Sequence, residues 1–107
     1  MTSAELRDYY KSYNKTYFGN RLPKRLRVYF GKTAPNHVAE TRITNWVPQY
    51  IVLRHELQFL ERIACTTLLH EMCHVEFPKT PQEHFHGSRF KRRMRKLVRQ
   101  GAFDNLW

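Results

Sequence analysis

The most informative segment of the chain is Thr67-Leu68-Leu69-His70-Glu71-Met72-Cys73-His74, an HExxH motif within an apolar helical pattern. In a helix, residues four apart lie about 40° apart around the axis and about 6 Å apart along it. Both imidazoles, His70 and His74, can therefore reach one zinc ion, with Glu71 beside it as a general base for water. The motif predicts that this stretch is helical and carries a metal site.

A catalytic zinc needs a third protein ligand and one open coordination position. His86 precedes Gly87 at the start of the last predicted helix, where a loop can return to the metal. Glu76 lies only two residues past His74 and so points away from it. We predict His86 as the third ligand. The alternatives that the sequence leaves open are His84, Glu83 and, least favoured because a thiolate would crowd the open position, Cys73.

Hydrophobic periodicity outward from the motif predicts an α+β fold. Apolar residues recur at helical spacing before the motif and towards both ends of the chain, whereas strand-like alternation marks the middle. We expect helices over residues 3–18, 56–76 and 87–100, and a small sheet of three strands over residues 26–30, 38–44 and 50–54. The turn Asn45-Trp46-Val47-Pro48 separates the last two strands.

Three apolar stripes, one on each predicted helix, are expected to face the core. They include Tyr9, Tyr10, Tyr13 and Tyr17 on the first helix, Leu57, Leu60, Ile63, Ala64, Thr67 and Leu68 on the second, and Phe90, Met94, Leu97 and Val98 on the third. The basic residues of the third helix are then expected to point outward.

Positive charge is concentrated near the C-terminal end of the 107-residue chain. The sequence has 19 Lys+Arg against 9 Asp+Glu, a formal net charge of +10. A stretch without acidic residues carries Arg89, Lys91, Arg92, Arg93, Arg95, Lys96 and Arg99. Such a field favours a polyanionic partner, and we predict that these side chains contact DNA phosphates. The alternative is a solvated helix face that confers solubility.

Length and composition predict a single domain over residues 1–107. Every apolar run is too short to span a bilayer, and the first residues lack the apolar stretch of a signal peptide. We therefore expect no membrane association and a cytoplasmic location, with a nucleoid-associated or nuclear location as the alternative.

The motif, joined to His86-Gly87-Ser88-Arg89-Phe90-Lys91-Arg92-Arg93-Met94, resembles the SprT-like metalloprotease family, which includes Spartan. The family pattern is LLHEMxH, a variable loop, and HGxxF near the start of a basic helix. Upstream, Tyr17-Phe18-Gly19-Asn20-Arg21-Leu22-Pro23 resembles the segment before the family's first strand. The resemblance implies a minimal, zincin-like SprT domain with zinc ligands His70, His74 and His86 and the catalytic glutamate Glu71. The paired-cysteine zinc ribbon of Spartan-type members has no counterpart in this sequence.

The resemblance implies a zinc-dependent metalloendopeptidase with one Zn²⁺ per chain. Spartan-type members act in DNA–protein crosslink repair, so DNA-bound or DNA-crosslinked proteins are the expected substrates. An extended substrate can pair with an exposed edge strand, for which residues 38–44 are the candidate. His84 and Tyr50 are candidates for stabilising the oxyanion. The alternative functions are a nucleic-acid-binding module with a structural zinc and a zinc hydrolase with a non-protein substrate.

Overall fold

A computed structural model describes residues 1–77 and 86–106 of the protein. The elements follow the chain as α1 (Ser3–Tyr17), β1 (Arg27–Gly31), β2 (Ala39–Thr44), β3 (Val47–Arg54), the 3-10 helix η1 (His55–Phe59), α2 (Glu61–Glu76) and α3 (Ser88–Arg99). Three helices and a small three-stranded sheet form an α+β fold, which confirms the predicted class. Within the described ranges, no helix is long and apolar enough to cross a membrane.

The sheet has the strand order β1-β3-β2, so β2 lies at one edge. β1 runs parallel to β3, with Val28 opposite Ile51, and β2 runs antiparallel to β3, with Thr41 also opposite Ile51. On the central strand β3, Ile51 and Leu53 are fully buried. The edge position predicted for residues 38–44 is confirmed for Ala39–Thr44.

The β2–β3 hairpin turns more tightly than predicted. Only Asn45 and Trp46 lie in the turn, both with positive φ (50° and 70°), as in a two-residue type I′ turn. Val47 and Pro48 belong to β3 instead of the turn. Pro48 lies where the pairing register with β2 is irregular, a position that tolerates a residue without a backbone N–H.

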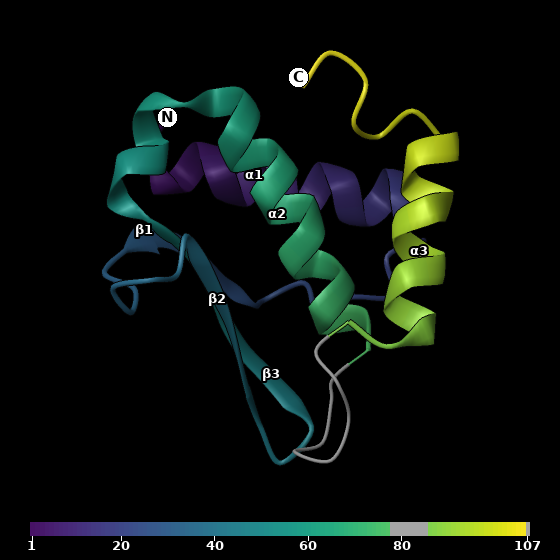
Figure 1. Ribbon diagram of the computed structural model, residues 1–107. Helices are drawn as coiled ribbons and strands as arrows, with labels where there is room; N and C mark the ends of the chain where they lie inside the picture. The colour runs from purple at the N-terminus through teal and green to yellow at the C-terminus, as the bar shows by residue number, and fades with distance from the viewer. Residues whose placement is uncertain (78–85, 107) are drawn as a thin grey trace.

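Helix α2 is the central element of the fold, since it contacts α1, α3 and the strands β2 and β3 (Figure 1). It begins at Glu61, not at residue 56, because Leu60 has a non-helical conformation and the preceding residues form η1. Two residues that we predicted on its core side, Leu60 and Ile63, are about half exposed. Ile63 lies two turns before His70 and therefore shares the side of α2 that carries the metal ligands.

The core lies between the sheet and the helices α1 and α2, and α3 closes it from the far side of α2. The prediction for the tyrosine stripe is confirmed, because Tyr10 is buried and the other three pack against the core. On α3, Phe90 and Leu97 are buried, but Val98 is exposed, against our prediction. Val98 is about 100° around the helix from Leu97, which moves it off the buried face.

Candidate metal centre

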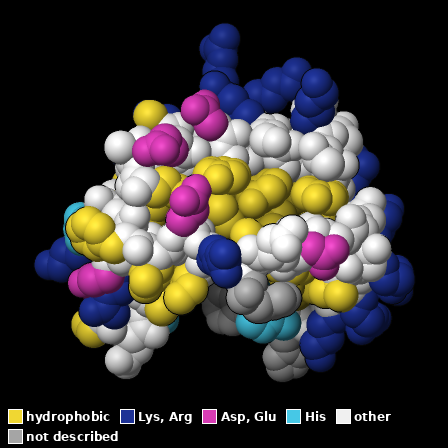
Figure 2. Space-filling view, turned by 90° about the horizontal axis from the view of Figure 1, so that it is seen from above, with side chains coloured by type: hydrophobic (Ala, Val, Ile, Leu, Met, Phe, Trp, Pro, Cys, Tyr) yellow, Lys and Arg dark blue, Asp and Glu magenta, His cyan; other side chains and the backbone are white. Residues whose placement is uncertain are grey.

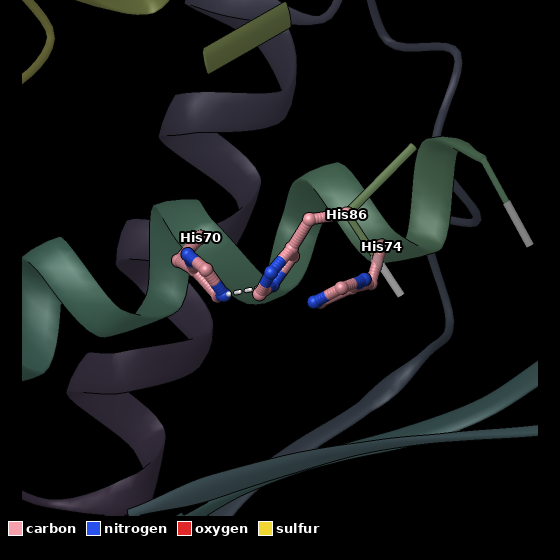
Figure 3. Close-up of side chains that lie close together, drawn as sticks. All are labelled: His70, His74 and His86. Atoms are coloured by element: carbon pink, nitrogen blue, oxygen red, sulfur yellow. Dashed lines mark hydrogen bonds between the residues drawn. The ribbon is translucent and has the colours of Figure 1, made fainter. Parts of the chain in front are cut away.

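The three predicted zinc ligands lie together at the C-terminal half of α2 (Figure 3). His70 and His74 are one turn apart on α2, and His86 comes from the residues that precede α3. Their ligand nitrogens all lie within 4.8 Å of one another. Of the alternatives for the third ligand, Glu83 and His84 lie outside the described residues.

One pair of these nitrogens has the spacing of a tetrahedral zinc site. Zinc–nitrogen bonds of about 2.05 Å place two nitrogens of a tetrahedron about 3.3 Å apart. His70 Nε2 and His86 Nε2 are 3.3 Å apart. Burial lowers the pKa of His70, and the neighbouring His86 adds to this effect, so His70 favours the neutral form that binds metal. The donor set and spacing therefore suit a three-histidine zinc site.

Cys73, inside the motif, is not part of this cluster. Its side chain is fully buried, and its thiol contacts Met94 Sδ at 3.6 Å. Burial raises the pKa of Cys73 to about 12, which disfavours the thiolate that would bind zinc.

Phe90 packs against the whole histidine cluster. Its ring centroid lies 5.1 Å from that of His70, 4.5 Å from that of His74 and 4.6 Å from that of His86. We predicted Phe90 as a core residue, which is confirmed, but its contact with all three ligands was not predicted. The short separation of four residues between His86 and Phe90 was the available signal.

Glu71 lies beside the cluster in a largely apolar environment, with 7% of its surface exposed. The Thr41 hydroxyl donates a hydrogen bond of 2.7 Å to Glu71 Oε1. The other carboxylate oxygen, Oε2, lies 3.9 Å from His70 Nε2. Burial raises the pKa of Glu71, and the Thr41 hydrogen bond partly opposes this shift. Thr41 thus holds Oε1 of the Glu71 carboxylate, and Oε2 faces the histidine cluster.

A cleft of about 650 Å³ runs between this site and the edge strand. Glu71, His74 and His86 line it on the helical side, and β2 lines it on the other. Tyr50, a candidate for oxyanion stabilisation, also lines the cleft, and its ring lies 5.9 Å from that of Tyr29. An extended chain placed in this cleft would pass both the histidine cluster and a strand edge.

The chain matches a known protein family over most of its length. The model of the SprT-like family matches residues 6–105. The chain belongs to the SprT-like family. No curated protein and no solved structure matches it at a significant level. The match begins within the first turn of α1 and extends past the end of α3, so the histidine cluster, Glu71 and the cleft all lie within it.

The basic helix of this SprT-like protein presents most of its charge to solvent. Figure 2 shows Lys and Arg side chains gathered along the side of the molecule that α3 occupies. The exposed members of the predicted set are Arg89, Lys91, Arg92, Arg95, Lys96 and Arg99. Arg93 differs from the expected outward orientation, because its side chain is 11% exposed and is paired with Glu76. It lies about 60° around the helix from the buried Phe90, close enough to the buried face to turn inward.

Two contacts of this SprT-like site were not predicted from the sequence. Thr41 is separated by 30 residues from Glu71, and no local pattern connects them. Glu76 was set aside as a ligand, and the structure agrees, because its carboxylate pairs with Arg93 and Arg21. An acidic residue at the end of one predicted helix, followed in the chain by a basic helix, was the signal for the second contact.

Proposed function

We propose that this protein is a zinc-dependent metalloendopeptidase that hydrolyses protein substrates. One observation supports the proposal most strongly: three imidazoles converge beside a buried glutamate at the wall of a cleft that an edge strand lines. A site of three protein ligands with an adjacent general base is typical of catalytic zinc, whereas a closed structural site requires no such base. Membership of the SprT-like family supports the same function.

In this proposal, His70, His74 and His86 hold the ion. Zinc, when bound there, supplies Lewis-acid polarisation of the scissile carbonyl and makes water a better nucleophile. Glu71 accepts the proton of the attacking water and returns it to the leaving amine. The oxygen that does so is Oε2, because Oε1 is engaged by the Thr41 hydroxyl.

The substrate in this proposal binds in extended form along the edge of β2. Among the described residues, β2 pairs with β3 alone, so one side of its backbone is available for hydrogen bonds to another chain. An added strand would be held by main-chain hydrogen bonds with little dependence on substrate sequence. It would also place its carbonyl groups next to the histidine cluster, because the same strand lines the cleft.

The test of this function combines metal analysis with cleavage of an unfolded protein. The purified protein should contain one zinc per chain and cleave reduced casein, and chelation should remove both the metal and the activity. Readdition of zinc should restore cleavage. A protein that binds zinc and DNA but cleaves neither casein nor histone would instead support the nucleic-acid-binding module with a structural zinc.

A DNA-binding function of α3 is a second proposal, based on charge. Arg89, Arg92, Lys96 and Arg99 are spaced three, four and three residues apart, so they lie within about 80° of one another around the helix. This row can follow a DNA backbone through phosphate contacts. DNA-bound or DNA-crosslinked proteins would then be the substrates, because DNA would bring protease and substrate together. A cytoplasmic protein at the nucleoid, or a nuclear one, would have access to them.

A further inference from the structure

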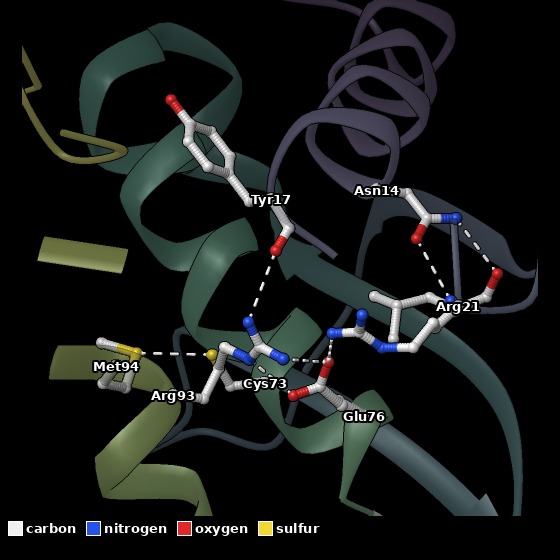
Figure 4. Close-up of polar contacts among 8 residues, drawn as sticks. Asn14, Tyr17, Arg21, Cys73, Glu76, Arg93 and Met94 are labelled. Atoms are coloured by element: carbon white, nitrogen blue, oxygen red, sulfur yellow. Dashed lines mark hydrogen bonds and ion pairs between the residues drawn. The ribbon is translucent and has the colours of Figure 1, made fainter. Parts of the chain in front are cut away.

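Three charged side chains from distant segments form one cluster at the C-terminal end of α2 (Figure 4). Arg93 of α3 donates to both carboxylate oxygens of Glu76, the last residue of α2, at 2.6 Å and 3.0 Å. Arg21, from the segment between α1 and β1, donates to Glu76 Oε2 at 3.1 Å. Glu76 and Arg93 are about nine-tenths buried, whereas the Arg21 side chain is 57% exposed. The Glu76–Arg93 pair is therefore the buried part of the cluster, and two hydrogen bonds join its carboxylate and guanidinium.

Arg93 also contacts the end of α1. Its guanidinium carbon lies 5.4 Å from the centre of the Phe18 ring, and Nη1 lies 3.5 Å from the carbonyl oxygen of Tyr17. The side chain thus reaches from α3 past the end of α2 to the end of α1. Because both the carboxylate and the guanidinium are planar, a two-pronged pair fixes their relative orientation as well as their distance.

The pair joins α2, which supplies two of the metal ligands, to α3, which begins shortly after the third. Glu76 is two residues past His74, and α3 begins two residues after His86. Other contacts between α2 and α3 near the site include Phe90 against His74, Met94 against Cys73, and the Arg89 guanidinium over the Phe77 ring at 5.3 Å. Side-chain packing sets the crossing geometry of two helices only to within about 15–20°. A two-pronged pair between the end of α2 and α3 narrows the rotation and axial position of α3 further.

We propose that the Glu76–Arg93 pair positions His86 as the third metal ligand. Glu76 and Arg93 are positioning residues, which touch neither metal nor substrate and act by fixing the start of α3 relative to α2. The proposal deepens the proposed function, because it rests on zinc binding by the three histidines. It also predicts a specific asymmetry: the pair matters for ligand sets that include His86 and does not matter for a set confined to α2.

The experiment measures the zinc dissociation constant by chelator competition for Arg93→Met in three backgrounds. Methionine keeps an unbranched apolar side chain and removes the two-pronged donor. In the wild type and in His70→Ala, where the ligand set still includes His86, Arg93→Met should weaken zinc binding about tenfold or more, the size of effect typical when the residues that support metal ligands are lost. In His86→Ala, the remaining ligands both lie on α2, and Arg93→Met should change the constant less than about twofold.

Two controls separate positioning from loss of charge or of fold. Arg21→Met removes an arginine from the same carboxylate without breaking the link to α3, and Arg92→Met removes an exposed charge from the same helix. Both should leave zinc affinity unchanged. Far-UV circular dichroism of the metal-free proteins checks folding, and if Arg93→Met does not fold, Arg93→Lys is tested in the same three backgrounds, with a smaller loss in the same pattern.

Equal zinc affinity with and without Arg93, or an equal loss in the His70→Ala and His86→Ala backgrounds, would overturn the positioning role. The same pattern in a protein that cleaves no substrate would support the positioning role and contradict the proposed peptidase function. If the wild type cleaves its substrate normally and zinc affinity is the same with and without Arg93, only the positioning role would be contradicted. A wild type that binds no zinc would contradict both.

Discussion

The Thr41 hydroxyl holds Glu71 Oε1 through a hydrogen bond of 2.7 Å that joins the edge strand β2 to helix α2. Because Oε2 remains directed at the histidine cluster, the strand that lines the cleft also sets the orientation of the proposed general base. In the proposed function, a substrate bound along β2 would therefore be mechanically connected to the proton transfer by Glu71.

Thr41→Val should lower kcat by about tenfold or more and leave zinc content unchanged. Valine preserves the shape of the side chain but cannot hold the carboxylate, and small displacements of catalytic groups are costly. Steady-state cleavage of a peptide substrate provides the measurement. Thr44→Val, at an exposed position of the same strand, is the matched control and should behave as the wild type. An unchanged kcat in Thr41→Val would contradict the orienting role.

Glu71→Gln should bind zinc normally and lose at least about 10²-fold in cleavage rate. Glutamine is nearly isosteric and can still accept the Thr41 hydrogen bond, but it cannot take up a proton. DNA binding should be unchanged, because α3 has no part in the proton transfer, and DNA should accelerate the wild type but not the variant. A zinc-loaded Glu71→Gln protein that cleaves at the wild-type rate would show that the assigned mechanism is wrong.

Alanine at His70, His74 or His86 should abolish tight zinc binding, measured by metal analysis after dialysis. Each substitution removes one of three nitrogens that lie within 4.8 Å of one another. His55→Ala is the matched control, because His55 is an exposed histidine on η1 and should not affect the metal. His84→Ala should also retain most of the zinc. Loss of metal in His84→Ala combined with its retention in His86→Ala would identify a different third ligand.

DNA affinity should fall with rising salt along a log–log slope of about −3.6, as expected for about four phosphate contacts. Reversing the charges of Arg92, Lys96 and Arg99 should weaken binding strongly and flatten the slope. Fluorescence anisotropy with a short duplex over a salt series measures both effects. Little dependence on DNA sequence is expected, since phosphate contacts carry no base information. A slope near zero would refute phosphate binding by α3.

Trp46→Gly should raise the free energy of unfolding by about 0.5 kcal/mol or more. Trp46 adopts a φ of 70° in the β2–β3 turn, a conformation that glycine accepts without the steric cost of a side chain. Its side chain is 58% exposed, so little packing is lost. Chemical denaturation measures the change, and Trp46→Ala, which keeps a Cβ, should show no such gain.

Much of the fold follows from the sequence by itself, because helices and strands impose a local period. The spacing of His70 and His74 places both on one side of α2 whatever surrounds the helix. Alternation identified the three strands, and the basic helix was predicted to within about a residue at each end. The family resemblance, carried by the HExxH segment and the residues that follow His86, is confirmed over residues 6–105.

The tertiary structure decided the contacts between residues distant in the chain. The approach of His86 to His70, the hydrogen bond from Thr41 to Glu71 and the inward turn of Arg93 all depend on how separate elements pack. Periodicity defines the sides of a helix but not which neighbour covers each side, and so Ile63 and Val98 were wrongly placed in the core. The sequence determined the chemistry available on each element, and packing determined which of those groups meet, because only packing fixes the relative rotation and position of the elements.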